Sequence, residues 1–259
     1  NRILEVDLTH QSFTVTEVSE AERRMYMGGK GLGLKLLYDR LTPGVDPLGP
    51  ENIFVLTTGV FMGTGVPCSG RFEAVSKSPL TGLMASSSCG GSFGMALKTS
   101  GWDGMVIKGR SETPVYLYVD SNGVEFRSAD ELWGQGTRSA EAALTKEGGG
   151  ALVIGQAGEN QVYYANIRSG HRFLGRGGMG AVLGSKNLKG IAARGKEYKI
   201  VPRDKKRVAK ANRRFFGYIN HNEVTAGSFR SYGTNANLNI GNRTGILPVR
   251  NFTGGSHGA

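Results

Sequence analysis

Apolar and polar residues alternate along much of residues 1–200, and a period of two is typical of half-buried β-strands. The alternation over residues 4–8 resumes over residues 13–15 after a polar turn, which predicts an antiparallel hairpin. Asn122-Gly123 is the strongest turn signal, because a type I′ hairpin turn requires positive φ at both central residues. Further strands are predicted at Asn52–Thr57, Arg71–Val75, Leu83–Ser87, Met105–Lys108, Val115–Val119, Val124–Phe126 and Leu152–Ile154.

Helical apolar spacing replaces this alternation in a few short segments. It runs over Glu20–Leu41, where Gly28–Gly33 is either a loop between two helical pieces or, as we favour, a surface for close packing. Thr137–Lys146 also predicts a helix, which Gly148–Gly150 ends. The mixture of elements predicts a strand-rich α+β fold with short helices.

The composition changes near Gly195, which divides residues 1–200 from residues 201–259. Past this point, Pro202 is expected to start a helix with one apolar stripe and a cationic remainder. For these cations we favour a solvated surface over the docking of an acidic partner. From Asn222 onward the chain is polar and glycine-rich, so the core of this second domain is expected to lie elsewhere.

Thirty-two Lys and Arg against 21 Asp and Glu give a net charge of +11, which indicates an acidic ligand, an acidic partner or nucleic acid. Nucleic acid is disfavoured, because aromatic residues do not alternate with the cations at a base-stacking spacing. Cys68, Cys89 and four isolated histidines show no metal-ligand spacing. With no membrane-spanning apolar run and no signal peptide, we expect a cytoplasmic protein that does not contact the membrane.

Glycines and cations interleave between Arg168 and Gly180. Backbone amides uncovered by glycine, beside guanidinium groups, form a site for phosphate or pyrophosphate. Gly175–Gly180 also has the G-x-G-x-x-G spacing of a dinucleotide-binding loop, with Glu197 near the position of a ribose-binding acid. That loop belongs directly after a strand, whereas polar residues separate it from the nearest strand-like run, Val162–Ile167. A Rossmann-type domain and a basic polyanion-binding module are therefore the alternatives.

Four blocks of sequence occur in the order found in one known family. They are Phe61–Phe72, Ser76–Gly82, Gly155–Asn160 and Gly170–Lys189. Together they resemble the N-terminal cofactor-binding domain of the tungsten-containing aldehyde:ferredoxin oxidoreductases, and Leu247–Phe252 is similar to the start of that family's helical second domain. The resemblance implies two β-sheets related by pseudo-twofold symmetry. They form the base for a tungsten bis-pterin (molybdopterin) cofactor, whose two phosphates a magnesium ion bridges.

Matched by position, the resemblance assigns as cofactor-binding residues Arg71, Ser88, Cys89, Gly90, Arg172, Phe173, Gly175 and Arg176. The backbone carbonyls of Ser88 and Phe173 are expected to face the magnesium. The family commonly has Asn in place of Ser88 and a small residue in place of Phe173, whose ring must point into the domain or cover a pterin. Cys68 and Cys89 are expected to be small buried thiols and not metal ligands.

For the whole protein, the resemblance implies oxidation of aldehydes to carboxylic acids with ferredoxin as electron acceptor. The family binds a 4Fe-4S cluster and takes its catalytic acid and base residues from domains outside this one. We therefore expect the chain to be inactive alone and to need the remaining C-terminal domains or a completing subunit. A homodimer and an anaerobic setting are implied for the complete protein, and a cofactor subunit of an aromatic acyl-CoA reductase is the alternative within the family.

Overall fold

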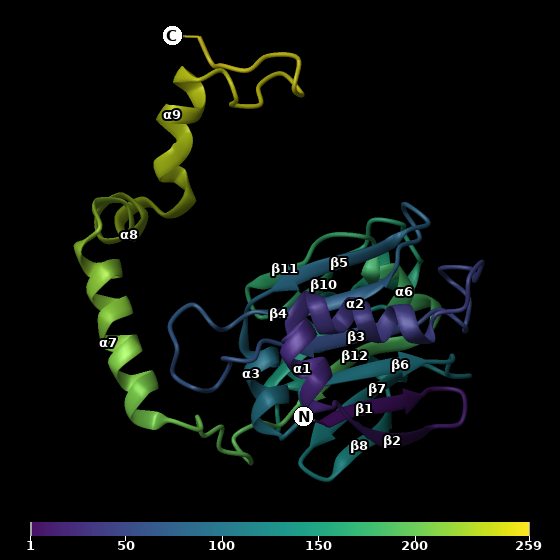
Figure 1. Cartoon of the computed structure of the whole chain (residues 1–259). Coiled ribbons are helices and arrows are strands. Elements are labelled where there is room, and N and C mark those ends of the chain that lie inside the picture. The colour runs from purple at the N-terminus through teal and green to yellow at the C-terminus, as the bar shows by residue number, and fades with distance from the viewer. Residues whose placement is uncertain (1, 259) are drawn as a thin grey trace. The chain divides into compact units, whose positions relative to one another are not determined.

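The computed structural model describes residues 2–258 and divides into two compact units, one that runs to Val201 and one that begins at Pro202. Among its described residues, the first unit has twelve strands in two six-stranded sheets, with short helices packed against them (Figure 1).

Sheet A comes from the first half of this unit. Its strands are β1 (Arg2–Asp7), β2 (Ser12–Glu17), β3 (Phe54–Thr58), β4 (Phe72–Lys77), β5 (Met84–Cys89) and β6 (Gly104–Lys108), in the order β2-β1-β6-β3-β4-β5. β1 and β6 run parallel, and the other neighbouring pairs are antiparallel. The predicted hairpin and the four predicted strands of this half are therefore present, with bounds shifted by one or a few residues.

Sheet B comes from the second half. Its strands are β7 (Val115–Asp120), β8 (Gly123–Ser128), β9 (Gly150–Val153), β10 (Ile167–Ser169), β11 (Arg172–Leu174) and β12 (Leu188–Ala193), in the order β11-β10-β9-β12-β7-β8. The predicted Asn122-Gly123 hairpin joins β7 to β8. The strand-like run Val162–Ile167 was wrongly read, because Ala165 donates its N–H to the Val162 carbonyl in a turn. Only Ile167 of that run belongs to a strand.

The two sheets share one topology. β1 to β6 correspond in order, direction and neighbours to β7 to β12. A helix follows the fifth strand of each half, α3 (Ser92–Thr99) after β5 and α6 (Met179–Ser185) after β11. Both helices are preceded by a glycine with positive φ, Gly91 at 104° and Gly178 at 63°. The halves are thus a structural repeat related by pseudo-twofold symmetry.

The register of the repeat follows from residues 93–109 and 179–195, which occupy the same places in the two halves. The same residue type stands at four pairs of equivalent positions, namely Gly94 and Gly180, Leu97 and Leu183, Gly104 and Gly190, and Gly109 and Gly195. A Cβ at Gly104 would lie 2.3 Å from the Leu56 carbonyl oxygen, and a Cβ at Gly190 would lie 2.4 Å from that of Leu152. The backbone of a neighbouring strand therefore excludes any larger residue at both equivalent places.

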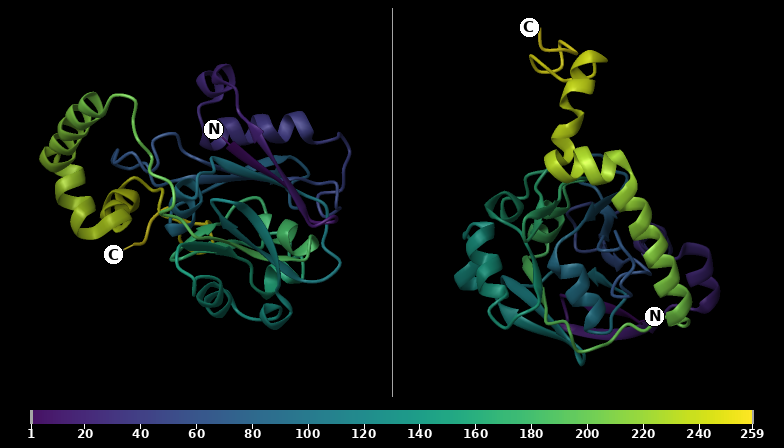
Figure 2. Two further views of the ribbon diagram at one scale, coloured as in Figure 1. Left: turned by 90° about the horizontal axis from the view of Figure 1, so that it is seen from below. Right: turned by 90° about the vertical axis from the view of Figure 1, so that its left-hand side faces the viewer.

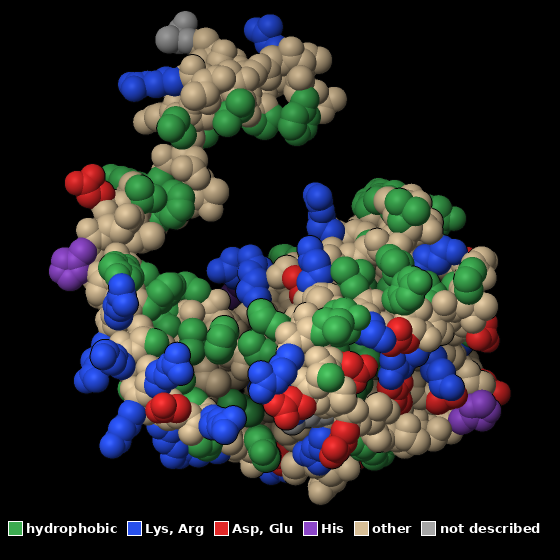
Figure 3. All heavy atoms as spheres, viewed as in Figure 1, with side chains coloured by type: hydrophobic (Ala, Val, Ile, Leu, Met, Phe, Trp, Pro, Cys, Tyr) green, Lys and Arg blue, Asp and Glu red, His purple; other side chains and the backbone are tan. Residues whose placement is uncertain are grey.

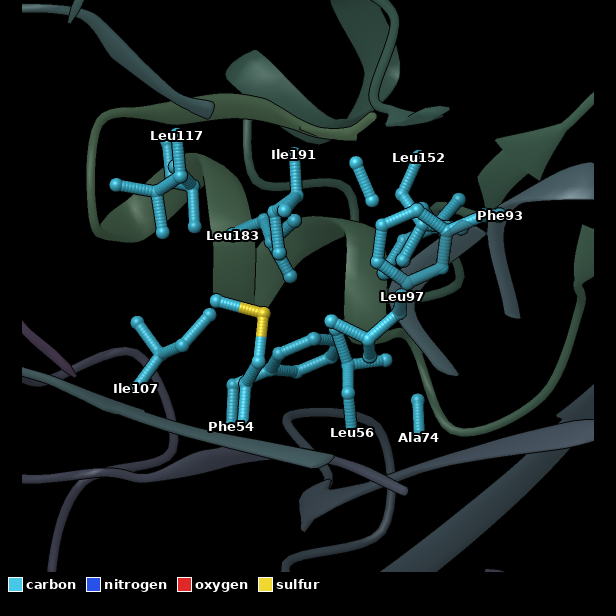
Figure 4. Packing of buried hydrophobic residues seen from close by; sticks show 14 of the residues in the cluster. Phe54, Leu56, Ala74, Phe93, Leu97, Ile107, Leu117, Leu152, Leu183 and Ile191 are labelled. Atoms are coloured by element: carbon cyan, nitrogen blue, oxygen red, sulfur yellow. The ribbon is translucent and has the colours of Figure 1, made fainter. Parts of the chain in front are cut away.

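The main hydrophobic core lies between the two sheets. Residues from sheet A face residues from sheet B, and side chains of α3 and α6 fill the space between them (Figure 4). The residues labelled there include Phe54, Leu56 and Ile107 of sheet A, Leu117, Leu152 and Ile191 of sheet B, and Leu97 and Leu183 of the helices. Because side chains alternate along each strand, the residues between those of the core point to the opposite, outward face of each sheet.

Helices cover the outward faces of the sheets. α2 (Gly29–Arg40) packs on β3 and β4 of sheet A, and α4 (Thr137–Leu144) packs on β9 and β12 of sheet B. The resulting layers are helix, sheet, helices, sheet, helix (Figure 2). The helices α1 (Glu20–Tyr26) and α5 (Gln156–Glu159) and the 3-10 turn Asp130–Leu132 complete the unit.

The glycine-rich segment near residue 30 serves packing, as we favoured. The helical conformation is interrupted at Met27 and Gly28, between α1 and α2, and most of the glycines lie inside α2. A Cβ at Gly33 would lie 2.8 Å from Val75 Cγ2. The missing side chain therefore lets α2 lie close against β4.

The second unit is helical, with α7 (Lys205–His221), α8 (Phe229–Tyr232) and α9 (Leu238–Arg243), a π-helical turn at Glu223–Ser228 and a 3-10 turn at Gly233–Asn237. α7 begins after Asp204, whose side chain accepts the Arg207 N–H, and not at Pro202 as predicted. Of residues 202–258, Gly241 alone is buried. Large apolar side chains are exposed along the unit (Figure 3), namely Phe215, Phe216, Tyr218, Val224, Phe229, Tyr232, Leu238, Ile240, Ile246 and Phe252. None of the helices between residues 2 and 258 has the length and apolar character needed to cross a bilayer.

Candidate cofactor-binding face

The hairpins β4-β5 and β10-β11 come from different sheets and meet at their edge strands, β5 and β11 (Figure 1). The backbone N–H of Arg176 donates to Ser87 Oγ at 3.2 Å. On the other side, a Cβ at Gly91 would lie 2.8 Å from the Ser169 carbonyl oxygen. The chain segments that follow β5 and β11 therefore belong to one continuous face.

The residues assigned by resemblance gather on this face. Exposed there are Arg71, Ser88, Arg172, Phe173, Gly175 and Arg176. Gly90 is half-buried, and Cys89 is buried in the core. The Phe173 ring is 51% exposed, so it does not point into the domain, which was one of its two expected positions.

Arg71 and Arg172 approach the segment Ser88–Gly90 from opposite hairpins. Arg71 Nη1 lies 3.5 Å from the Ser88 carbonyl oxygen, at the outer limit of a hydrogen bond. Arg172 Cγ lies 3.9 Å from the Cβ position of Gly90. Two arginine side chains thus flank one short stretch of backbone, an arrangement suited to phosphate oxygens.

The two cysteines differ in their surroundings. Burial raises the pKa of the Cys89 thiol to about 11, although the cations Arg71 and Arg172 act in the opposite direction. The thiol donates to the Gly90 carbonyl at 3.1 Å, and it is neutral near pH 7. Because metal ligation needs a thiolate, this state fits the expected structural role of Cys89. Cys68 is exposed, so the expectation of a buried thiol was wrong there.

Ser88 and Phe173 occupy equivalent positions in the two halves. In sheet A the register runs from Gly104 through Thr57 and Glu73 to Ser88. In sheet B the register runs from Gly190, the counterpart of Gly104, through Val153 and Arg168 to Phe173. The two carbonyls expected to face magnesium therefore belong to residues paired by the pseudo-twofold symmetry.

A charged side chain lies across the strand pair from each of these residues. Neither was assigned to the site from the sequence, although Arg168 begins the glycine- and cation-rich segment. Opposite Ser88, burial raises the pKa of Glu73, against the influence of the Ser88 hydroxyl, Lys30 and Arg71. Its Oε2 atom is buried without a hydrogen-bond partner. The only signal was a carboxylate within a strand that is otherwise apolar at its centre.

Opposite Phe173, the corresponding residue is Arg168. Its Nε lies 2.9 Å from Glu141 of α4 and donates to the Gly170 carbonyl at 2.8 Å. The strand residue is thus anionic in one half and cationic in the other. This inversion makes the two halves of the face chemically unequal.

Only part of the glycine-rich segment is open to a ligand. A Cβ at Gly178 would lie 1.8 Å from the Tyr163 carbonyl oxygen, and a Cβ at Gly177 would lie 2.9 Å from the Cβ atom of Ala85. At Gly175 the nearest atom to such a Cβ, Asn166 Oδ1, is 4.0 Å away. Gly177 and Gly178 therefore serve packing, whereas the backbone at Gly175 and Arg176 is exposed.

The dinucleotide-binding alternative fails on topology. The G-x-G-x-x-G segment does connect a strand, β11, to a helix, α6. However, β11 is an edge strand antiparallel to β10, and two strands separate it from β12. The parallel βαβ unit that places a pyrophosphate at the helix N-terminus is absent from the described part of sheet B. All residues of α6 are buried between the sheets.

Fold and face together define an α+β domain built from two symmetry-related halves, with arginines gathered where the two hairpins meet. The sequence signature of the aldehyde ferredoxin oxidoreductase N-terminal domain matches residues 3–195. The chain therefore belongs to the aldehyde ferredoxin oxidoreductase family.

Relatives of known identity agree with this assignment. The chain is 41% identical over 98% of its length to the tungsten-containing aldehyde ferredoxin oxidoreductase of Thermococcus kodakarensis, and covers 43% of that protein. It is 33% identical over 97% of its length to the WOR-like subunit of an aliphatic sulfonate oxidoreductase of Pyrococcus furiosus, again covering 43%. The chain thus spans less than half the length of these relatives.

A solved structure shares the fold. It is the active site complex BamBC of benzoyl coenzyme A reductase in complex with 1,5-dienoyl-CoA, with a TM-score of 0.83 and 35% identity. The match covers 86% of this chain and 35% of the other. The arrangement of two sheets in this chain is therefore shared with that complex.

Proposed function

We propose that the chain is the cofactor-binding part of a tungstopterin oxidoreductase that oxidises aldehydes to carboxylic acids and passes electrons to ferredoxin. The observation that carries this proposal is the match to tungsten-containing aldehyde ferredoxin oxidoreductases along 98% of the chain. The structure adds that the positions which the family resemblance assigns lie together on one cationic face.

The residues of this face fit a phosphate-bearing pterin cofactor. Arg71, Arg172 and Arg176 are exposed and close to open backbone, and the Gly175 position has room for an approaching oxygen atom. Guanidinium groups bind phosphate through two parallel N–H donors, which fixes orientation as well as charge. These arginines would hold and orient the phosphate ends of the cofactor.

Magnesium would sit between the two halves. Ser88 and Phe173 are equivalent by register, so a cation on the symmetry axis can receive a carbonyl oxygen from each. Such oxygen ligands suit magnesium, and the bridged phosphates would supply further oxygens. Neither side chain needs to take part, which explains how Ser and Phe can stand at equivalent places.

The bound tungsten centre supplies the two-electron oxidation, while the protein supplies position and electrostatics. The cations of this face offset the phosphate charge. The neutral Cys89 thiol lies in the core and would not ligate the metal. We assign no catalytic acid or base to residues of this chain.

The rest of the machinery is proposed to come from outside the chain. A 4Fe-4S cluster, the acid and base residues and the ferredoxin contact would belong to C-terminal domains or to a completing subunit, and the complete protein would be a cytoplasmic homodimer. The exposed apolar residues of the second unit support this, since a helical segment without a core needs apolar partners. The chain by itself is expected to be inactive.

An aromatic acyl-CoA reductase is the second candidate, because the benzoyl-CoA reductase complex shares the fold at a TM-score of 0.83. Reaction assays separate the two. Aldehyde-dependent reduction of ferredoxin by the anaerobically purified complete protein supports the first function. Oxidation of a cyclic dienoyl-CoA without aldehyde turnover supports the second.

Arginine variants test the cofactor face. In the complete protein, Arg71→Ala and Arg172→Ala should each lower tungsten and pterin content, because a charge-assisted hydrogen bond contributes about 1.5–3 kcal/mol. Lys206→Ala on α7 is the control, since it removes a cation from the other unit. If both arginine variants keep wild-type metal and pterin content, the assignment of this face as the cofactor-binding face is wrong.

A further inference from the structure

Asn166 occupies in the second half the place that Arg71 occupies in the first. Each residue directly precedes a strand, Arg71 before β4 and Asn166 before β10. Continued one position beyond the pairs Phe72 with Cys89 and Ile167 with Leu174, the register sets Arg71 opposite Gly90 and Asn166 opposite Gly175. Arg71 and Asn166 are therefore related by the pseudo-twofold symmetry.

The side chains behave alike as well. Both residues are exposed, and each reaches toward the neighbouring strand of its hairpin. Arg71 Nη1 lies 3.5 Å from the Ser88 carbonyl oxygen, and Asn166 Oδ1 lies 4.0 Å from the Cβ position of Gly175. Asn166 thus borders Gly175, where a Cβ would meet open space.

Their chemistry differs in one respect. Arg71 brings a fixed positive charge, whereas Asn166 brings a neutral amide with two N–H donors and one acceptor oxygen. The second half instead carries its charge on Arg172 and Arg176, in and just beyond β11. The face therefore presents cations in both halves, but from different strands.

We infer that Asn166 is a cofactor-contacting residue, the uncharged counterpart of Arg71, and that it binds the second half of the cofactor by hydrogen bonds from its uncharged amide. This inference rests on the proposed function, because the ligand is the phosphate-bearing pterin of that proposal. It goes beyond the positions that the resemblance assigns, which do not include Asn166. The symmetry of the two halves and the open space at Gly175 carry it.

The test is a near-isosteric charge change in the complete, anaerobically purified protein. Asn166→Asp places a carboxylate against the phosphate and should lower retained tungsten and pterin about tenfold. Asn166→Ala removes only hydrogen bonds from an uncharged amide. It should lower the retained tungsten and pterin about threefold. Asn160→Asp, at the exposed end of α5, is the matched control and should retain wild-type content. Metal is measured by mass spectrometry, pterin by fluorescence of its oxidation product, and folding by melting temperature.

The outcomes separate this inference from the proposal beneath it. If Arg71→Ala loses cofactor while Asn166→Asp and Asn166→Ala both keep it, Asn166 is an ordinary surface residue and the inference is wrong, although the cofactor face stands. Wild-type protein without tungsten, molybdenum or pterin would overturn both. Should Asn166→Asp fail to fold, Asn166→Ala decides, and equal loss in Asn160→Asp would count against a specific contact.

Discussion

Asp103 and Lys189 occupy equivalent places in the two halves, each directly before a recurring glycine, yet they carry opposite charges. Each forms an ion pair, Asp103 with Lys98 and Lys189 with Glu159. The Lys189 side chain is fully buried and that of Glu159 is 5% exposed. The repeat has thus kept an ion pair at this place while inverting its charges.

The buried pair gives the first prediction. Lys189 Nζ also donates to the Gln135 carbonyl at 2.9 Å, and Glu159 accepts the Gly134 N–H at 2.9 Å, so the pair ties three chain segments together. Glu159→Gln should lower the free energy of unfolding by about 3–5 kcal/mol, because it leaves a buried cation without its partner. Thermal unfolding and hydrogen exchange at β12 measure the change. The exposed pair of Glu20 with Arg24 is the control, and Glu20→Gln should change little.

The glycine segment gives a second prediction, with two glycines in opposite roles. Gly178→Ala should prevent normal folding, because φ is 63° and the new Cβ would lie 1.8 Å from a backbone oxygen. Gly175→Val should fold, since its Cβ has open space, but should lose tungsten because the branched side chain blocks the backbone. Soluble yield, melting temperature and metal content distinguish the two. A fully loaded Gly175→Val protein would show that no ligand approaches there.

Phe173 and its neighbour Leu174 give a third prediction. The Phe173 ring is 51% exposed, whereas Leu174 is fully buried in the core. Leu174→Ala should therefore lower the free energy of unfolding by about 2–5 kcal/mol, and Phe173→Ala by clearly less. Phe173→Ala should instead reduce pterin retention, because an exposed ring that does not point into the domain is expected to cover a pterin. A large loss of melting temperature with full pterin content in Phe173→Ala would reverse this reading of the loop.

Lys186 gives a prediction about pH. Its buried ammonium donates to the Pro50 carbonyl at 3.1 Å and to the Gly109 carbonyl at 2.9 Å. Burial lowers the pKa of Lys186 from 10.5 to about 8. Between pH 8 and 10.5 the unfolded chain therefore binds more protons at this residue than the folded chain, and its contribution to stability rises with pH.

Lys186→Met isolates that contribution, because other titrating groups are common to both proteins. The stability of the wild type relative to Lys186→Met should rise between pH 8 and 10.5, by no more than about 3 kcal/mol. Melting temperatures at several pH values in this range measure the difference. A difference independent of pH would mean that Lys186 remains charged in the folded protein.

Much of the fold follows from local pattern. The strands of sheet A were predicted within a few residues because their alternation is regular, and Asn122-Gly123 specified its hairpin through backbone conformation alone. The helix α3 was missed, since its eight residues include a glycine and lie between glycines that indicate a loop. Val162–Ile167 was misread because a short apolar run looks the same in a turn as in a strand.

The strand pattern, the basic, glycine-rich segment and the family can be read from the sequence, because local backbone preference and motif spacing are properties of neighbouring residues. That Ser88 matches Phe173, that Asn166 matches Arg71 and that the half-buried Glu73 lies near two cations follows from the folded chain alone. These relationships depend on strand register. It is set by hydrogen bonds between strands far apart in the chain and by the packing of two sheets on shared helices, and a shift of one residue would turn each of these side chains to the opposite face.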